Sequence, residues 1–167
     1  SDDVIDFARR EIGAVLGLAC DAHFALAGGA FKTLLHGRPP RDLDLWAASE
    51  EDRARLVDGL WRQGAVQLAP RPFADAFVVA ERVVEVPHRP YGASIEARMA
   101  QFDLGLSAVA AVHAPGDRWR AHVHPLADAS VAKRSVQLIK PLVNWRHALA
   151  TLARLADRFA VHGLLIG

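Results

Sequence analysis

The order of hydrophobic and polar residues in the first part of the chain predicts alternating helices and strands. Residues 3–19 place apolar side chains at helical spacing, which predicts an amphipathic helix. Residues 24–27 form a short apolar run that predicts a strand ending at two glycines, and residues 30–36 predict a short helix. Residues 41–47 alternate with the period of a strand, whereas residues 49–63 begin with a serine and three acids, which is typical of a helix start.

The rest of the chain predicts more strands and then helices. Runs of aliphatic and β-branched residues predict strands at residues 65–69, 76–80, 82–87, 102–113 and 119–123. A short helix or a turn is predicted at residues 94–101, and helices are predicted at residues 127–139 and 142–162. Pro141 separates the last two helices, because proline cannot continue a helix from within.

This order of elements predicts an α+β fold, with a small mixed β-sheet and flanking helices. The chain has 167 residues and 51% hydrophobic residues, which suits one compact domain and argues against intrinsic disorder. We expect residues 1–125 to form the α+β core. Residues 126–167 are expected to form a helical segment that packs on this core as part of a single compact unit.

The charge composition excludes some classes of protein. Lysine and arginine total 20, and aspartate and glutamate total 19, so the net charge is +1. This balance argues against a protein that coats nucleic acid, and we expect no recognition of duplex DNA. Residues 1–85 carry 14 acids and 10 bases, a net charge of −4, whereas residues 86–167 carry 5 acids and 10 bases, a net charge of +5. This difference in net charge between the two parts of the chain reflects either chance or two oppositely charged faces of the folded protein.

Cysteine content and hydropathy suggest a cellular compartment. Cys20 is the single cysteine, so no disulfide can form within the chain, which fits a reducing cytoplasm. No apolar run approaches the roughly 18 residues that a membrane-spanning helix needs. The acidic start of the sequence lacks the pattern of a signal peptide. We therefore expect a cytoplasmic protein without a membrane partner.

Two carboxylates in a predicted strand form the first candidate for chemistry. Asp42 and Asp44 are two positions apart, so in a strand they project from the same face. Carboxylates this close repel each other unless a cation lies between them. Mg²⁺ is commonly bound by one or two carboxylates together with substrate phosphates. The segment therefore predicts a site for one or two Mg²⁺ ions, which would activate an attacking oxygen and stabilise a leaving phosphate.

The glycine pair before the predicted helix at 30–36 is the second candidate. Gly28 and Gly29 allow close approach of the backbone, and the helix that follows would offer free N–H groups to the phosphates of a nucleotide. Taken alone, a glycine pair is more often a tight turn, and an Asp-x-Asp strand is more often a solvated edge. The two patterns in this order and spacing favour a functional site.

The two segments together resemble the nucleotidyltransferase superfamily of the DNA polymerase β type. Its signature is a hydrophobic residue before Gly-Gly or Gly-Ser, followed by two acids that alternate with hydrophobic residues. The matching segments here are Ala27-Gly28-Gly29-Ala30 and Asp42-Leu43-Asp44-Leu45. Ala30 stands where the family often has serine, which removes a hydroxyl that could contact phosphate. The resemblance implies a nucleotidyltransferase-like core.

The resemblance also implies a third acid on a later strand. Glu85 fits best because Val84 and Val86 flank it, whereas Glu81 is the alternative and lies beside Arg82. Glutamate in place of aspartate lengthens this ligand and shifts the metal geometry slightly. A weaker similarity covers Phe102-Asp103-Leu104 and a late helix over residues 146–163. The whole resemblance spans about residues 24–163.

The activity implied by the resemblance is Mg²⁺-dependent nucleotidyl transfer. An acceptor hydroxyl would attack the α-phosphate of a nucleoside triphosphate, with ATP as the expected nucleotide, and pyrophosphate would leave. The implied catalytic and metal-binding residues are Asp42, Asp44 and Glu85. The implied backbone ligands of the phosphates are Gly28, Gly29 and Ala30. The acceptor is left open between a small molecule, a protein and an RNA end, and the short chain favours a small molecule, a protein or an acceptor that a partner presents over a large RNA.

Two basic residues near these motifs are further candidates for nucleotide binding. Lys32 follows the glycines by three residues, so its ammonium group could reach a phosphate. Arg41 flanks the acidic strand and could orient the substrate. Both also suit a solvated surface, which is the common place for long charged side chains.

Two other classes of function compete with the enzyme. The chain could be a catalytically silent nucleotidyltransferase-like module that binds a partner or oligomerises. It could also be an α+β interaction domain whose motif is coincidental. The presence of three acids favours the enzyme, because a silent module has no reason to keep all of them.

Overall fold

The computed structural model describes residues 2–17, 20–102, 104–133 and 135–139, together with residues 146, 149–151, 153–154 and 165–166. Asp103 and most of the helix expected over residues 142–162 lie outside the described residues. The division between a core at 1–125 and a helical segment at 126–167 therefore stays a prediction. None of the helices in the described part of the chain is long and apolar enough to cross a membrane.

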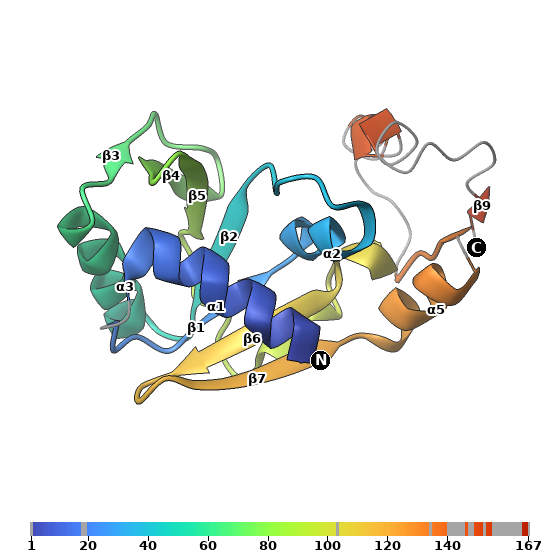
Figure 1. Cartoon of the computed structure of the whole chain (residues 1–167), viewed down its shortest axis with the longest axis horizontal. Helices are drawn as coiled ribbons and strands as arrows, with labels where there is room; N and C mark the ends of the chain where they lie inside the picture. The colour runs from blue at the N-terminus through green and yellow to red at the C-terminus, as the bar shows by residue number, and fades with distance from the viewer. Residues whose placement is uncertain are drawn as a thin grey trace.

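Within the described residues, seven strands form one mixed β-sheet. The strands are β1 (Phe24–Ala27), β2 (Leu43–Ala47), β3 (Val66–Gln67), β4 (Ala74–Val79), β5 (Arg82–Pro87), β6 (Val109–Ala114) and β7 (Arg118–Val123). Their order in the sheet is β3-β4-β5-β2-β1-β6-β7 (Figure 1). β2 and β5 run parallel, whereas the other neighbouring pairs are antiparallel. The prediction of a small mixed sheet with an α+β fold is confirmed.

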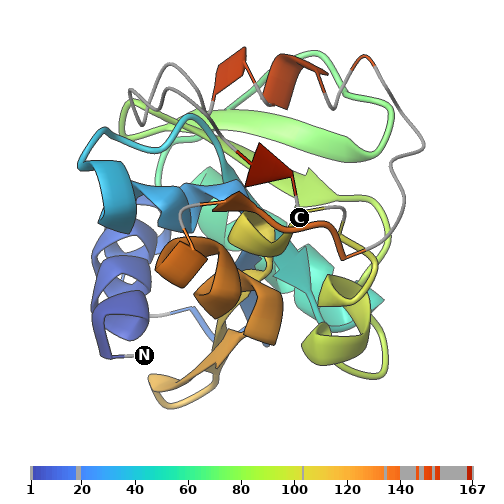
Figure 2. The same cartoon turned by 90° about the vertical axis from the view of Figure 1, so that its right-hand side faces the viewer.

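Helices pack on both faces of this sheet. The described part of the chain includes the α-helices α1 (Asp2–Leu16), α2 (Thr33–His36), α3 (Glu50–Arg62), α4 (Ile95–Met99) and α5 (Pro125–Lys133), and the 3₁₀ turns η1 (Gly29–Lys32) and η2 (Gly105–Ser107). α1 and α3 share the larger buried cluster with the sheet, whereas α4 packs in a smaller cluster rich in alanine. Figure 2 shows α1 and α4 on opposite sides of the sheet. A short pair of strands, β8 (Ser135–Val136) and β9 (Leu165–Ile166), lies apart from it.

The period-two pattern of β2 explains which side chains face which cluster. Leu43 and Leu45 are almost completely buried under α1 and α3. The alternate positions, Asp44 and Trp46, are only partly buried and face the other side of the sheet. Alternation along a strand makes this separation unavoidable once one face is apolar. The fold therefore turns the acids away from the main core.

Two predicted elements are shorter than the sequence pattern indicates. The apolar run at 102–113 is not one strand, because η2 precedes β6, and the helix expected over 127–139 stops at Lys133. The backbone N–H of Gly105 donates to the carbonyl of Gln137 over 2.8 Å. A Cβ on Gly105 would lie only 2.5 Å from the carbonyl oxygen of Leu126. Contacts between these two distant segments therefore override the local apolar pattern of each.

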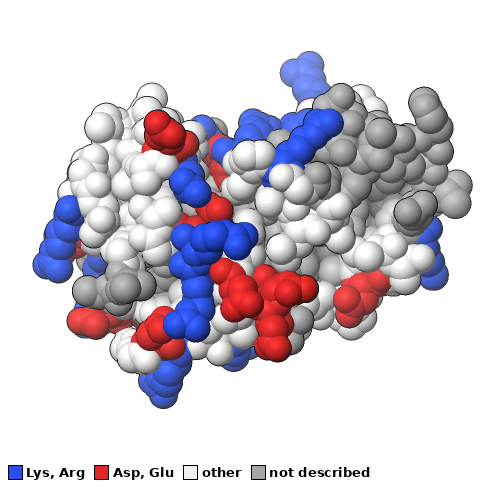
Figure 3. Space-filling view, viewed as in Figure 1, with Lys and Arg blue, Asp and Glu red and all other residues white. Residues whose placement is uncertain are grey.

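The charged side chains do not separate by sign on the face that Figure 3 shows. Basic and acidic groups are interspersed there, around α1. Arg9 from the acidic first part of the chain pairs with Asp117 from the basic second part, over 2.6 Å. Folding thus places oppositely charged residues of the two parts of the chain side by side. On this face the two parts do not form separate negative and positive surfaces.

Candidate active site

The first two acids come from the start of β2. Asp44 lies within the strand and Asp42 directly precedes it, two positions away. Both are flanked by the buried Leu43, which fixes the strand against the core. The side chain of Asp42 is 22% exposed, and Asp44 is partly buried. The predicted placement of two carboxylates on one face agrees with this geometry.

Glu85 reaches the same face from β5. In the parallel pairing of the two strands, Glu85 is the direct partner of Asp44. Val84 and Val86 on either side of Glu85 are completely buried, so its side chain points away from the main core, as that of Asp44 does. The structure thereby brings Asp42, Asp44 and Glu85 together from two strands.

Glu81 lies in a different setting. It forms the hairpin between β4 and β5 together with Ala80, and both residues have positive φ angles, 61° and 49°. Glu81 therefore lies in the turn and is not part of the strand. The periodicity of a continuous strand, which would place Glu81 and Glu85 on the same face, does not apply to it. Arg82, the next residue, is paired with Glu11 of α1.

The glycine turn lies directly against the acids. Gly28 directly follows β1, has a φ angle of 100° and donates its N–H to the carbonyl of Val109 over 3.1 Å. A Cβ on Gly28 would lie 3.4 Å from Oδ2 of Asp44. The two halves of the sequence motif are therefore adjacent in space. Glycine is needed at this position because L side chains rarely adopt such a backbone conformation.

Replacing Gly28 by Ala is expected to destabilise the protein by about 1–3 kcal/mol, because the backbone conformation is strained for any residue with a Cβ. Gly29→Ala is the matched control, because Gly29 has no positive φ angle and its Cβ would meet only the movable end of Lys32 at 3.4 Å. Urea unfolding measures both variants. Equal stability of the two variants would contradict this assignment of strain to Gly28.

The segment after the glycines differs from the helix expected over 30–36. It begins as the 3₁₀ turn η1 and continues as the single α-helical turn α2. Ala30 is buried, whereas Lys32 folds back so that its Nζ would lie 3.4 Å from a Cβ on Gly29. Because so short a helix has a small dipole, contacts to a phosphate would depend on backbone N–H groups and on Lys32. Arg41 is exposed beside Asp42 in the chain.

One residue of this site is not predicted by any pattern in the sequence. Arg71, in the loop between β3 and β4, places Nη1 3.3 Å from Oδ2 of Asp42 and forms an ion pair with Glu85. Its guanidinium therefore bridges two of the three acids. Arg71 lies 29 positions from Asp42 in the sequence, so no local pattern connects the two. The local feature of the sequence that distinguishes Arg71 is its position between two prolines, Pro70 and Pro72.

The carboxylate set suits a hard cation by its chemistry. All three side chains offer oxygen ligands, as Mg²⁺ prefers. Burial and the nearby charge of Asp42 raise the pKa of Asp44 to about 6, against the opposite effect of Arg71. A cation would relieve this repulsion. Among the described residues, no three acids, histidines or cysteines form a group that could hold a metal ion as they are placed. Arg71 pairs with both Asp42 and Glu85, so a cation bound between these two acids would have to displace its guanidinium.

The raised pKa of Asp44 predicts a pH-dependent stability. The folded protein holds this proton more tightly than the unfolded chain, whose pKa is near 3.8, so ionisation of Asp44 opposes folding. As pH rises from about 4 to about 6, the wild type should lose up to about 3 kcal/mol of stability relative to Asp44→Asn, with no further change at higher pH. Urea unfolding at pH 4, 5, 6 and 7 tests this difference. Two parallel curves would contradict it.

Comparisons with known proteins show which solved structures have a similar fold. No protein-family model matches the sequence, and no curated protein matches it. The structure is similar to the Thermotoga maritima CCA-adding enzyme complexed with tRNA, with a TM-score of 0.65 and 12% identity, covering 100% of this chain and 40% of that one. It is similar to a CCA-adding enzyme in complex with CTP, with a TM-score of 0.64 and 13% identity, covering 100% and 41%.

A third similar structure is a tRNA nucleotidyltransferase complexed with a primer tRNA and an incoming ATP analogue. Its TM-score is 0.60 at 15% identity, with 98% of this chain and 46% of that one covered. The chain thus spans less than half the length of these three proteins. At such low identity the likeness establishes the architecture. The chain therefore shares the fold of these CCA-adding enzymes and this tRNA nucleotidyltransferase, which agrees with the nucleotidyltransferase-like core that its glycine and aspartate motifs predicted.

Proposed function

We propose that the chain is a Mg²⁺-dependent nucleotidyltransferase module. It would transfer a nucleoside monophosphate from a nucleoside triphosphate to an acceptor hydroxyl and release pyrophosphate. The observation that carries the proposal is the convergence of the three motif parts. Gly28 lies against Asp44, and Glu85 is the strand partner of Asp44. A phosphate-binding turn beside a group of carboxylates is the arrangement that this reaction needs.

Each part of the proposed site has a role that its position supports. Asp42, Asp44 and Glu85 would hold Mg²⁺, which when bound supplies Lewis-acid polarisation of phosphate oxygens. The backbone at Gly28 and Gly29 has no Cβ, so a triphosphate can approach closely there. Backbone N–H groups from Gly28 to Ala30 would orient the phosphates for attack at the α-phosphate.

The side chains around these parts would complete the binding of substrate. The ammonium group of Lys32 folds over Gly29, where it can neutralise a phosphate charge. Arg41 is exposed beside the acids and would contact the nucleotide from the solvent side. Glu85 would assist in removing the proton from the acceptor hydroxyl, which it can reach from the strand next to Asp44.

The acceptor that we favour first is the terminal hydroxyl of an RNA. The similar structures were solved with tRNA, with CTP, and with a primer tRNA and an ATP analogue. ATP and CTP are therefore the first nucleotides to test, with ATP the expected one. Small molecules and protein hydroxyls are the alternative acceptors.

The test incubates the protein with Mg²⁺ and each labelled nucleoside triphosphate, with tRNA, total RNA, protein extract or metabolite extract as the acceptor. Incorporation of label that requires Mg²⁺ and releases pyrophosphate would support the proposal, and the labelled product identifies the acceptor. Calorimetry with Mg²⁺ and each nucleotide gives a second measurement. An absence of both labelling and metal-dependent nucleotide binding would refute the enzyme.

A catalytically silent binding module is the second candidate function. The observation that favours it is the bridge formed by Arg71, which satisfies Asp42 and Glu85 without a cation. A silent module would keep this ion pair permanently. Incorporation of label that requires Mg²⁺ would exclude this candidate, so the labelling experiment above separates the two.

A further inference from the structure

Arg71 is a cationic group that the structure places on two acids of the site. Its Nη1 lies 3.3 Å from Oδ2 of Asp42, and the same nitrogen forms the ion pair with Glu85. A guanidinium shared by two carboxylates is a strong, charge-assisted contact. The group occupies the position between the acids that a bound cation would need. Two positive charges cannot share the same carboxylate oxygens without strong repulsion.

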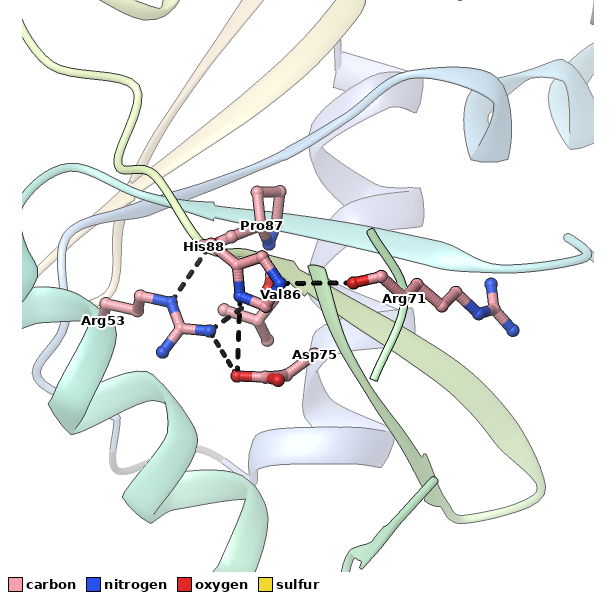
Figure 4. A network of polar contacts seen from close by, with 6 residues as sticks. All are labelled: Arg53, Arg71, Asp75, Val86, Pro87 and His88. Atoms are coloured by element: carbon pink, nitrogen blue, oxygen red, sulfur yellow. Dashed lines mark hydrogen bonds and ion pairs between the residues drawn. The ribbon is translucent and has the colours of Figure 1, made fainter. Parts of the chain in front are cut away.

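The backbone of Arg71 is held in place. Prolines on both sides fix their own φ angles and restrict the backbone of the residue that precedes each of them, which limits the movement of the loop. The N–H of Arg71 donates to the carbonyl of Ala74 over 2.9 Å. Its carbonyl accepts a hydrogen bond from Nε2 of His88 over 3.2 Å, as Figure 4 shows.

The His88 contact is itself supported by the sheet. The N–H of His88 donates to the carbonyl of Phe73 over 2.9 Å, and its Nδ1 lies 3.9 Å from Oδ2 of Asp75. Asp75 in turn accepts from Arg53 of α3 over 2.7 Å. In Figure 4 the side chain of Arg71 points away from this network. The loop is therefore anchored on one side, while the guanidinium reaches toward the acids on the other.

The side chain of Arg71 has the freedom that its backbone lacks. It is 40% exposed, and the loop residues around it are exposed as well. Rotation about its own side-chain bonds is enough to withdraw the guanidinium into solvent. Such rotations of exposed side chains are fast and need no movement of the backbone.

We propose that Arg71 is an internal counter-ion that holds Asp42 and Glu85 together until a divalent cation displaces it. This inference rests on the proposed function, since it concerns the same site. The anchored loop keeps the guanidinium near the acids, and the exposed side chain lets it leave. Once displaced, it can pair with the phosphates of a nucleotide, which guanidinium groups bind well. Binding of cation and binding of triphosphate would thereby support each other.

The test measures binding of Mn²⁺, as a spectroscopic substitute for Mg²⁺, to the full chain without nucleotide. Arg71→Gln should bind Mn²⁺ about tenfold more tightly than the wild type, because a competing charge is gone. Arg71→Lys should fall between the two, because an ammonium group keeps the charge but bridges two carboxylates less well. Arg62→Gln is the matched control, since Arg62 is 77% exposed in a pair with Asp58 on α3, and its affinity should stay within about twofold because exposed pairs are weak.

A second measurement follows Arg71 itself. In a nitrogen-15 spectrum, the side-chain Nε signal of Arg71 should shift in step with Mg²⁺ binding, whereas that of Arg62 should not. A static structural arginine would leave both signals unchanged. Thermal unfolding of each variant checks that the fold is retained, and Arg71→Lys decides the question if Arg71→Gln does not fold.

The outcomes separate this inference from the proposed function. If the wild type binds Mn²⁺, loses it in Asp44→Asn, and Arg71→Gln binds no more tightly, the counter-ion role is wrong while the proposed function stands. If neither the wild type nor Arg71→Gln binds Mn²⁺, both are wrong. Tighter binding in Arg71→Gln together with a moving Nε signal supports both.

Discussion

Asp42→Asn and Asp44→Asn are each expected to reduce nucleotidyl transfer by at least about a thousandfold while leaving the fold intact, since loss of a metal ligand removes several kcal/mol of transition-state stabilisation. The two carboxylates lie on one sheet face at the start of β2, with Gly28 against Asp44. Asparagine keeps the size of the side chain and removes the charge. The rate of labelled nucleotide transfer, with saturating Mg²⁺, measures the effect.

The matched control is Asp58→Asn, which removes an exposed carboxylate from α3, where Asp58 pairs with Arg62 over 2.9 Å. Its transfer rate should equal that of the wild type. Circular dichroism and thermal unfolding of all three variants establish that the fold is kept. Full activity in both β2 variants would mean that these carboxylates are not the metal site.

Glu85→Gln is expected to lower transfer by about a hundredfold or more, whereas Glu81→Gln should leave it within about twofold, because only a group near the reacting atoms stabilises the transition state. Glu85 is the direct strand partner of Asp44. Glu81 lies in the exposed hairpin turn at the start of β5. The comparison of kcat/KM for the two variants separates the two candidates for the third acid.

The Glu81 variant is also the control for a general loss of negative charge, since each substitution removes one carboxylate from the same hairpin. A Mn²⁺ titration gives a second readout, because Glu85→Gln should weaken cation binding and Glu81→Gln should not. The opposite result, an inactive Glu81→Gln and an active Glu85→Gln, would move the third acid to the hairpin turn.

The residue that the proposed reaction would need also lowers the stability of the fold near neutral pH. The pKa of Asp44 is raised to about 6 by burial and by Asp42, so near neutral pH its ionised form opposes folding. Functional sites commonly keep such groups at the expense of stability. Asp44→Asn is therefore expected to be the more stable protein and the inactive one.

Local patterns were sufficient for most of the elements near the site. The period-two alternation at 41–47 predicted β2, because one face of that strand is buried and the other is not. The N-cap of α3 was predicted from Ser49, whose side chain accepts from the N–H of Asp52. The glycine pair predicted a special turn, and Gly28 has the positive φ angle that only glycine adopts easily.

The patterns failed where a distant segment decides the backbone. The apolar run at 102–113 looks like one strand, but Gly105 bonds to Gln137 and approaches Leu126, so the first part forms η2 instead. For the same reason the helix expected over 127–139 ends at Lys133. Apolar periodicity describes burial, and several backbone conformations bury the same side chains.

The sequence by itself determined the glycine turn, the face on which Asp42 and Asp44 lie, and the class of fold, because these follow from local backbone preferences and strand periodicity. The tertiary structure alone decided that Glu85 stands beside Asp44, through the parallel pairing of β2 and β5. It alone brought Arg71 onto the acids from a loop 29 positions away from Asp42. Contacts of this kind depend on strand order and register, which no local pattern of residues encodes.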